Sequence, residues 1–298
     1  MKKDRMIVPK KRKQRDDRGL AFAFLLPSII LFIMFCYYPF AKTIINSFAV
    51  TDATGAFIRW NGLANWERVL TNKDFMQTLG NTFKYGALDL VMSFSAAMFF
   101  ALLSAKASKG SKIYQTLYAI PMALAAAPVA AIWIFIYREQ GGLLNQFLGT
   151  STAWIKNPDT ALIAVAVSAS WGHVAGRFIV LLAGFRNVSN DLVEAATIDG
   201  AGWWTRTFKI MIPMASPQIF YVLFTSIIGA FKTFSQIKLL TGGGPVGSTT
   251  TLMVSIYQKA SISGQIQSAC CLSLILFAII FIATRIQFLF EKKMVFYQ

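Results

Sequence analysis

The sequence EAATIDGA at residues 194–201, followed by IMIP at residues 210–213, lies in a polar loop between two long apolar segments. The flanking segments are Thr160–Gly184 and Pro217–Leu240. Each is longer than the roughly 20 residues that an α-helix needs to cross the apolar core of a bilayer. This alternation predicts a chain that crosses a membrane several times, with the loop 185–216 in water.

The composition supports a chain that is solvated largely by lipid. Hydrophobic residues make up 55% of the sequence and charged residues only 14%, whereas a soluble domain carries about 25% charged residues. No segment shows the alternation of a β-barrel strand, and each apolar segment can span alone. We therefore predict an all-α integral membrane protein. The six predicted spans are Leu20–Phe40, Leu79–Ser104, Ile113–Tyr137, Thr160–Gly184, Pro217–Leu240 and Ala269–Phe290.

The basic residues predict the orientation of these spans. The net charge is +16, and nine of the 29 basic residues lie within residues 1–19. With the N-terminus inside, 18 basic residues fall on the cytoplasmic side and 7 on the other, which agrees with the positive-inside rule. We predict that both termini are cytoplasmic, that residues 1–19 form a basic cytoplasmic segment, and that residues 20–298 form one membrane domain. We interpret the N-terminal basic cluster as the cytoplasmic flank of a transmembrane helix, rather than as an arm that binds nucleic acid or a partner.

The loop 185–216 carries the signals of a short helix. Asp191 is placed to cap a helix that starts near Leu192, with Glu194 at the third helical position of a capping box. Gly200 suits the left-handed residue that ends such a helix. The sequence therefore predicts a short helix in water between the fourth and fifth spans.

The rest of the loop leaves two interpretations open. Ala195 and Ala196 are small enough to let another surface approach, and Asp199 adds a second acid. A further helical stretch around Trp203–Met211 meets Pro213, which marks the join to the fifth span. From these residues alone, the loop is either a docking surface or a simple connection.

The loop resembles the coupling motif of permease subunits of binding-protein-dependent ABC importers, Glu-Ala-Ala-x3-Gly-x9-Ile-x-Leu-Pro. Ile212 stands where leucine is usual. Further segments resemble the sugar-permease branch, in the type similar to the first membrane subunit of the maltose and glycerol-3-phosphate permeases. These segments are 38–39, 47–48, 61–66, 81–82, Trp133, 142–145, 182–184, 231–234, 240–245, Gln287, 291–293 and Tyr297.

The resemblance implies the partners and the location of the chain. It implies a second, homologous permease subunit, two ATP-binding subunits inside, a solute-binding protein outside, and a multi-pass location in a prokaryotic cell membrane. ATP and Mg would bind to the partner ATPases and no cofactor to this chain. Carried over by position, the ATPase-coupling residues are Glu194, Ala195, Ala196, Asp199 and Gly200.

No motif for chemistry accompanies these features. The run at 242–245 is not followed by the Gly-Lys-Ser/Thr of a phosphate loop, and His173 is the only histidine. We therefore predict a transport subunit that is not an enzyme, with no catalytic, cofactor-binding or metal-binding residues.

Ionisable groups within the spans are costly and therefore indicate function. Arg177 and His173 share one face of the fourth span, and Asp89 of the second span is deep enough to pair with Arg177. Gly172 and Gly176 form a GxxxG pattern that favours close helix packing. The candidates for the substrate path are Arg177, Lys232, Trp171, Phe178, Phe231 and Phe234.

The predicted function is that of a permease subunit of an ATP-driven importer for a sugar or oligosaccharide. Arg177 and Lys232 leave open the same machinery with an anionic or phosphorylated polyol or saccharide as its solute. Two alternatives from other classes also stay open, an ion-driven secondary transporter and a membrane scaffold without transport.

Overall fold

A computed structural model describes residues 18–52, 54–105 and 111–296 of the chain. Most of the predicted basic segment 1–19, and Tyr297, lie outside these residues. The chain divides into two compact units, residues 1–45 and 46–298. The single membrane domain of residues 20–298 remains a prediction.

A continuous helical stretch fills the described part of the first unit and corresponds to the first predicted span. It consists of α1 (Arg18–Phe32), the π-helical η1 (Ile33–Tyr37) and α2 (Tyr38–Ser47). The N–H of Tyr38 donates to the carbonyl of Ile33. Pro39 has no N–H to donate, and the π turn just before it shifts the bonding register.

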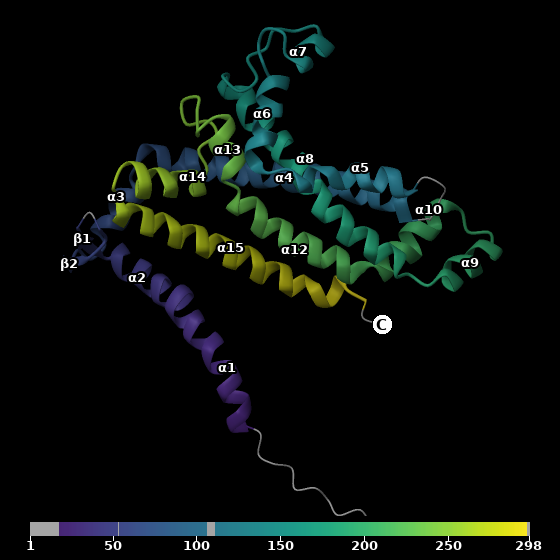
Figure 1. Cartoon of the computed structure of the whole chain (residues 1–298), viewed down its shortest axis with the longest axis horizontal. Helices are drawn as coiled ribbons and strands as arrows, with labels where there is room; N and C mark the ends of the chain where they lie inside the picture. Colours follow the sequence, from purple (N-terminus) through teal and green to yellow (C-terminus); the bar gives the residue numbers. More distant parts are fainter. Residues whose placement is uncertain (1–17, 53, 106–110, 297–298) are drawn as a thin grey trace, which may run out of the picture. The chain divides into compact units, whose positions relative to one another are not determined.

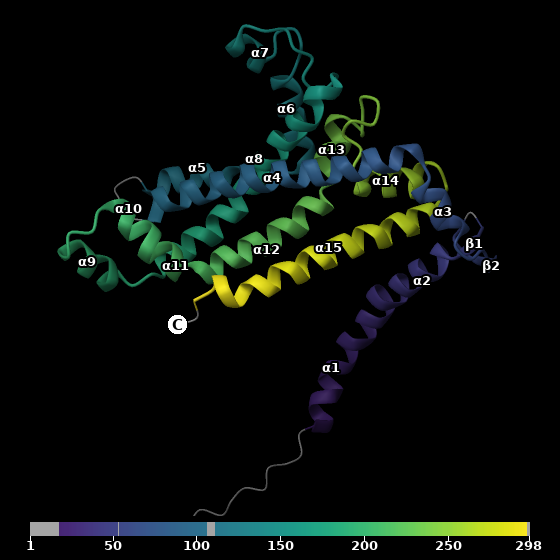
Figure 2. The ribbon, with the colours of Figure 1, turned by 180° about the vertical axis from the view of Figure 1, so that it is seen from behind.

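Four long helices run side by side in the second unit (Figures 1 and 2). They are α4 (Lys73–Ala105), α8 (Pro158–Arg186), α12 (Ser216–Lys232) and α15 (Ile266–Met294). α4 packs most extensively against α8. Small residues such as Ala97 and Ala101 of α4 are fully buried and share a hydrophobic cluster with the large side chains of α8.

Short elements connect the long helices at the end of this unit where α4 and α8 begin (Figure 1). A hairpin of β1 (Ala49–Thr51) and β2 (Phe57–Trp60) precedes α3 (Ala64–Leu70), and its strands are antiparallel. The other short elements are α7 (Leu143–Leu148), α13 (Ser235–Leu240), α14 (Leu252–Tyr257) and η3 (Gln258–Ile262).

Asn145 organises the connection between the third and fourth spans. Its side chain is 3% exposed and makes six hydrogen bonds. The amide group donates to three backbone carbonyls, and Oδ1 accepts from three donors, including the indole N–H of Trp154 at 2.8 Å. The other partners are Arg138, Glu139, Thr150 and Thr152.

The third predicted span is bent, which corrects the expectation of one helix over Ile113–Tyr137. α5 (Ser111–Ala123) and α6 (Ala126–Ile136) meet at an angle of 107°. Pro128 lacks an N–H, and the break places it in the first turn of α6, where that donor is not needed.

The fifth predicted span, Pro217–Leu240, is also interrupted, directly after Lys232. α12 ends at Lys232, and Thr233 adopts an extended backbone before α13 begins. The Thr233 hydroxyl donates to the carbonyl of Gly229 at 3.0 Å, the acceptor that its own N–H would have in an α-helix. The side-chain hydroxyl of Thr233 therefore takes the place of the backbone N–H as the donor to Gly229 at this helix end.

Within the part of the chain that the structure describes, no helix packs closely against Gly172 or Gly176, and their predicted role in helix packing remains a prediction. A Cβ atom added at Gly172 or Gly176 would meet nothing within 4 Å in this chain. The close approach lies instead at Gly184, where a Cβ would be 2.8 Å from Cβ of Gln218. Packing of α8 against α12 therefore uses a different glycine.

The structure confirms the predicted fold class. Five helices of the described residues are long and apolar enough to cross a membrane, and the bent pair α5 and α6 makes a sixth span when counted as one. Which side of the membrane the termini face remains a prediction.

Candidate functional site

The predicted coupling helix is present as α9 (Asn190–Ile198), but it begins earlier than expected. The Ser189 side chain accepts a hydrogen bond from the N–H of Asp191 at 3.2 Å and is the N-cap. The prediction of Asp191 as the cap, with Glu194 in a capping box, was therefore wrong. Ser189 has the extended backbone that an N-cap requires, and serine fills this position as well as aspartate does.

The end of α9 agrees with the prediction for Gly200. This glycine has a φ of +80°. Its N–H donates to Thr197 at 3.1 Å, and the N–H of Ala201 donates to Ala196 at 2.9 Å. These two bonds form a Schellman motif, which requires a left-handed residue at this position.

A second helical segment supports α9 from the C-terminal side. It consists of α10 (Trp203–Arg206), η2 (Thr207–Met211) and α11 (Ile212–Met214). The Arg206 guanidinium donates to the Thr197 hydroxyl at 2.6 Å, which links this segment to α9. The segment extends to Pro213, as the sequence predicts.

The side chains of α9 point largely to solvent. Glu194, Ala195 and Asp199 are exposed, and Ala196 is half-buried. Ile198 is 82% exposed. α9 lies at the end of the second unit where α8 ends and α12 begins (Figures 1 and 2).

The base of this loop is fixed to several helices. Arg186 donates to the carbonyl of Ser104 at 3.2 Å, which joins the ends of α8 and α4. The backbone N–H of Phe296 donates to Ser216 Oγ at 2.9 Å, which joins the chain after α15 to the start of α12. These two bonds link the ends of the four long helices at the base of the loop.

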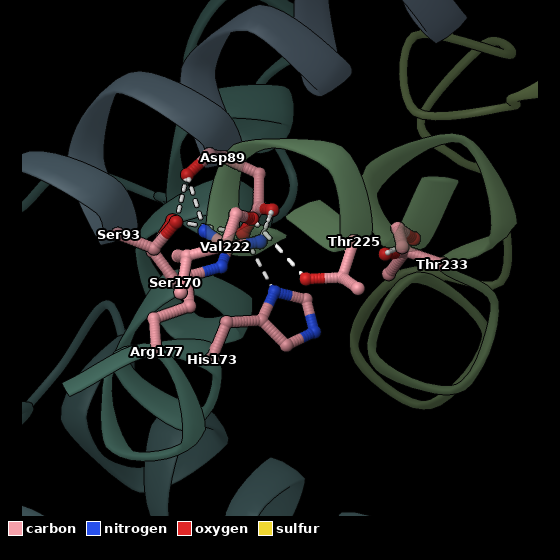
Figure 3. Close-up of polar contacts among 9 residues, drawn as sticks. Asp89, Ser93, Ser170, His173, Arg177, Val222, Thr225 and Thr233 are labelled. Carbon is pink, nitrogen blue, oxygen red and sulfur yellow. Dashed lines mark hydrogen bonds and ion pairs between the residues drawn. The ribbon is translucent and has the colours of Figure 1, made fainter. Parts of the chain in front are cut away.

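A second candidate site lies between α4 and α8, at the pair of residues that the sequence predicts to meet (Figure 3). Asp89 Oδ2 accepts from Arg177 at 3.0 Å, which confirms the predicted pairing. Asp89 Oδ1 lies 2.8 Å from His173 Nδ1. The carboxylate is fully buried, Arg177 is 9% exposed and the His173 side chain is 36% exposed.

Ser170 completes this cluster and was not predicted from the sequence. Its hydroxyl donates to Asp89 Oδ1 at 3.2 Å. Ser170 precedes His173 by three residues and Arg177 by seven, so all three lie on one face of α8. The spacing of three and four residues that placed His173 and Arg177 on one helix face also includes Ser170. The sequence prediction considered only charged and aromatic residues on that face.

Among the path candidates on α8, Trp171 lines a cavity and Phe178 does not. The cavity has a volume of about 380 Å³ and lies among α4, α5, α6 and α8. Phe178 is 1% exposed and packs edge-on against Tyr118, so its predicted contact with solute gains no support. The aromatic residues that line the cavity are Phe100, Tyr118, Trp133 and Trp171.

The remaining candidates surround the break after α12, and the structure does not gather them into one group. Phe231 packs edge-on against Phe83. Phe234, beyond the break, packs against Tyr257. Lys232 is exposed in the last turn of α12. Their roles in a substrate path remain predictions.

The part of the chain that the structure describes holds no group of three or more His, Cys, Asp or Glu side chains that could bind a metal ion.

The comparisons with known proteins determine the family. Residues 97–296 match the family described as "Binding-protein-dependent transport system inner membrane component". The chain belongs to this family. The permease is therefore a multi-pass protein of the cell membrane, and the predicted resemblance is confirmed.

Individual relatives match over nearly the whole permease. It is 30% identical over 286 residues to the sn-glycerol-3-phosphate transport system permease protein UgpA of Escherichia coli O157:H7, covering 95% of this chain and 97% of UgpA. The UgpA protein of Yersinia enterocolitica is also 30% identical, with 94% and 96% covered. These matches confirm the predicted resemblance to the sugar-permease branch.

Solved structures share the fold of the permease. A chain of a bacterial alginate ABC transporter, in complex with a periplasmic protein bound to alginate pentasaccharide, has a TM-score of 0.81 at 21% identity, with 95% of this chain and 98% of that chain covered. A chain of a bacterial ABC transporter involved in the import of alginate has a TM-score of 0.79 at 23% identity, with 91% and 96% covered.

Proposed function

We propose that this permease forms a translocation path for a sugar or oligosaccharide and is driven by two partner ATPase subunits that bind at α9. The observation that carries the coupling is that α9 is exposed while both its ends are fixed. Ser189 caps one end, and the Schellman motif at Gly200 fixes the other. A rigid helix held in this way can transmit a displacement.

The surface of α9 suits contact with a protein. Ile198, together with Trp203 and Trp204 of α10, exposes apolar area in a loop that the sequence predicts to lie in water. Apolar area gathered in one place marks an interaction surface. Ala195 and Ala196 permit close approach, and Glu194 and Asp199 offer carboxylates to a partner.

The motion of α9 would reach the membrane helices through its base. ATP-driven closure of the ATPases would displace α9, and the fixed joints at α8 and α12 would tilt those helices. Alternating access requires that this displacement favours one of two arrangements of the bundle. The complex would include a second, homologous permease subunit and, on the extracytoplasmic side, a solute-binding protein.

The choice of a sugar rests on the aromatic cavity. Four aromatic rings line it, and Ser170 adds a hydroxyl. Flat apolar rings suit the C–H faces of a pyranose, while hydroxyl groups bind its polar edge. A cavity of about 380 Å³ lies within the range of pockets that bind small molecules.

The coupling is tested by purifying the permease with its partners from its own host. The complex is measured for retained ATPase subunits and for ATP hydrolysis, in the wild type and in Glu194→Lys. We expect the substitution to release the ATPases or to abolish stimulated hydrolysis. Glu67→Lys provides a matched control, because Glu67 is also exposed but lies in α3, at the other end of the unit.

The alternatives predict different results. An ion-driven secondary transporter would retain no ATPase subunit, and its uptake would follow an ion gradient. A scaffold would leave the uptake of every solute unchanged in Glu194→Lys. Either result would overturn the proposed coupling.

A further inference from the structure

A cavity of about 750 Å³ lies between α4 and α8, near the ends at which both helices begin. α5 packs against these two helices, but α6 turns away from α5 by 107°. The cavity is lined by α4, α8 and Ser248, and by no residue of α5 or α6 that the structure describes. This cavity, called the groove below, is therefore not covered by the third span.

The lining of the groove changes from polar to apolar along α4. The polar residues come first and are Gln77, Asn81 and Lys84, and the apolar residues that follow are Leu88, Val91 and Met92. At 1.5 Å per residue, the whole stretch covers about 20 Å of the helix. A phospholipid has the same order, with a polar headgroup at the membrane surface and acyl chains toward the centre of the bilayer.

Two opposite charges in the groove have no partner. Lys84 and Asp159 both line it and are exposed, yet neither forms an ion pair with any residue that the structure describes. Charged side chains within a span normally pair or face a water-filled cavity. The groove therefore presents one free cation and one free anion to a ligand.

The two charges lie at different heights. Arg186 donates to the carbonyl of Ser104, which aligns the inner ends of α8 and α4. Lys84 is 20 residues before Ser104, and Asp159 is 27 residues before Arg186. At 1.5 Å per residue, these separations are about 30 and 40 Å. Asp159 is therefore nearer the membrane surface, and the long side chain of Lys84 can extend toward it.

Ser248 adds a hydroxyl group to the groove. Its Oγ atom is buried and has no hydrogen-bond partner among the described residues. The loop that carries it is held by Asn81, whose side chain donates to the carbonyl of Gly247 at 2.8 Å. A buried polar atom without a partner is costly, so a ligand that forms a hydrogen bond to Ser248 is favoured.

We propose that the groove binds a zwitterionic phospholipid whose headgroup carries a free ammonium, as in phosphatidylethanolamine. The ammonium contacts Asp159, the phosphate contacts Lys84, and an acyl chain lies along Leu88 and Val91. In this lipid the ammonium is attached beyond the phosphate, and the acyl chains lie on its other side. The order Asp159, Lys84, Leu88 therefore follows the order of groups along the lipid.

The lipid site is separate from the aromatic cavity of the proposed path. Met92 lines both and therefore stands between them. A lipid also suits the groove better than a protein helix does. A helix would need an acid and a base at matching heights, whereas one headgroup supplies both charges.

The test measures lipid binding to the complete, delipidated complex by native mass spectrometry. The probes are phosphatidylethanolamine, phosphatidylcholine and phosphatidylglycerol with identical acyl chains. Phosphatidylcholine keeps both charges but has no ammonium N–H, and phosphatidylglycerol has no cation. We expect one site at which phosphatidylethanolamine binds about tenfold more tightly than either, as one hydrogen bond to a charged group predicts.

Variants test the two charges and their order. Lys84→Gln and Asp159→Asn should each abolish the preference for phosphatidylethanolamine. The double variant Lys84→Asp/Asp159→Lys keeps the net charge but reverses the order, so it should not restore the preference. Lys156→Gln and Asp74→Asn are matched controls, because both residues are exposed and lie outside the groove. Both controls should keep the preference.

Three results would overturn the proposal. One is equal affinity of the wild type for the three lipids, a measurement that needs no variant to fold. Another is a folded Asp159→Asn complex that keeps the preference. The third is a photoreactive residue at Val91 that crosslinks to the second permease subunit instead of to lipid. Failure of the proposed coupling would appear separately, in Glu194→Lys, since lipid binding is measured without ATP.

Discussion

Gly184 of α8 lies directly against Gln218 of α12, and a Cβ atom added to this glycine would be 2.8 Å from Cβ of Gln218. The two helices flank the loop that carries α9, so the residues at which the chain enters and leaves this loop are held together at this contact. A displacement of this loop would therefore act on α8 and α12 together.

Gly184→Ala should destabilise the permease because the added methyl group overlaps Gln218. Overpacking of this kind costs about 1–3 kcal/mol, and we expect a lower melting temperature together with weaker solute-stimulated ATP hydrolysis. Gly176→Ala in the same helix meets no atom within 4 Å. That control should be neutral or stabilising, by up to about 1 kcal/mol. Equal losses in both variants would contradict the role of the contact.

Gly200→Ala should loosen the end of α9, since alanine at a φ of +80° is strained by roughly 1–2 kcal/mol. Hydrogen exchange of the α9 amides should accelerate, and the coupling of ATP hydrolysis to uptake should fall. Gly202→Ala is the control two residues away, because Gly202 has a φ of −65° and no neighbour within 4 Å of an added Cβ. If α9 exchanges at the same rate in both variants, the Schellman motif does not stabilise it.

Asn145→Ala should be strongly destabilising because it leaves three backbone carbonyls and three donors without their partner. We expect a loss of about 2–4 kcal/mol, seen as a lower melting temperature in nanodiscs. Gln146→Ala removes an exposed neighbouring side chain that donates to the carbonyl of Gly141 at 3.3 Å, and it should change stability by less than about 0.5 kcal/mol. A small effect at Asn145 would show that water satisfies the freed groups.

Trp171→Ala should weaken transport of a sugar by removing one ring of the aromatic cavity. A tenfold rise in KM for uptake corresponds to about 1.4 kcal/mol of lost interaction. Trp171→Phe keeps a flat ring and should recover most of the affinity. If alanine and phenylalanine have the same KM, the cavity is not part of the path.

The long spans were predictable because lipid requires long runs of apolar residues. α4, α8 and α15 contain the predicted segments and extend beyond them by a few residues. Asp89 and Arg177 were also predictable as a pair, since two opposite charges at similar depth have few other partners in the membrane. The long spans follow from apolar composition, and the pair follows from the depth of the two charges in their spans. Both can be read from the sequence.

The interruptions were harder to predict because they depend on local backbone choices. The bend before Pro128 lies inside a continuous apolar run, where hydropathy gives no signal. The end of α12 at Lys232 lies in a mixed stretch of apolar and polar residues, 231–238, which is compatible with a continuous helix as well as with a break. The cap of α9 was misassigned because Ser189 and Asp191 are both good caps, and only the backbone of residue 189 decides between them. Gly184 was not predicted as the contact glycine because its role depends on the face of α8 that meets α12. The sequence of α8 alone does not reveal that face.

The bond from Phe296 to Ser216 Oγ gives the last span a mechanical role. Phe288, near the far end of α15, also packs against Phe220 and Phe224 of α12. The bond therefore adds a second attachment between these two helices, at the point where the loop that carries α9 leads into α12. Under the proposed coupling, a displacement of α9 would move α12 and α15 together as one lever, and a truncation just before Phe296 would weaken that linkage.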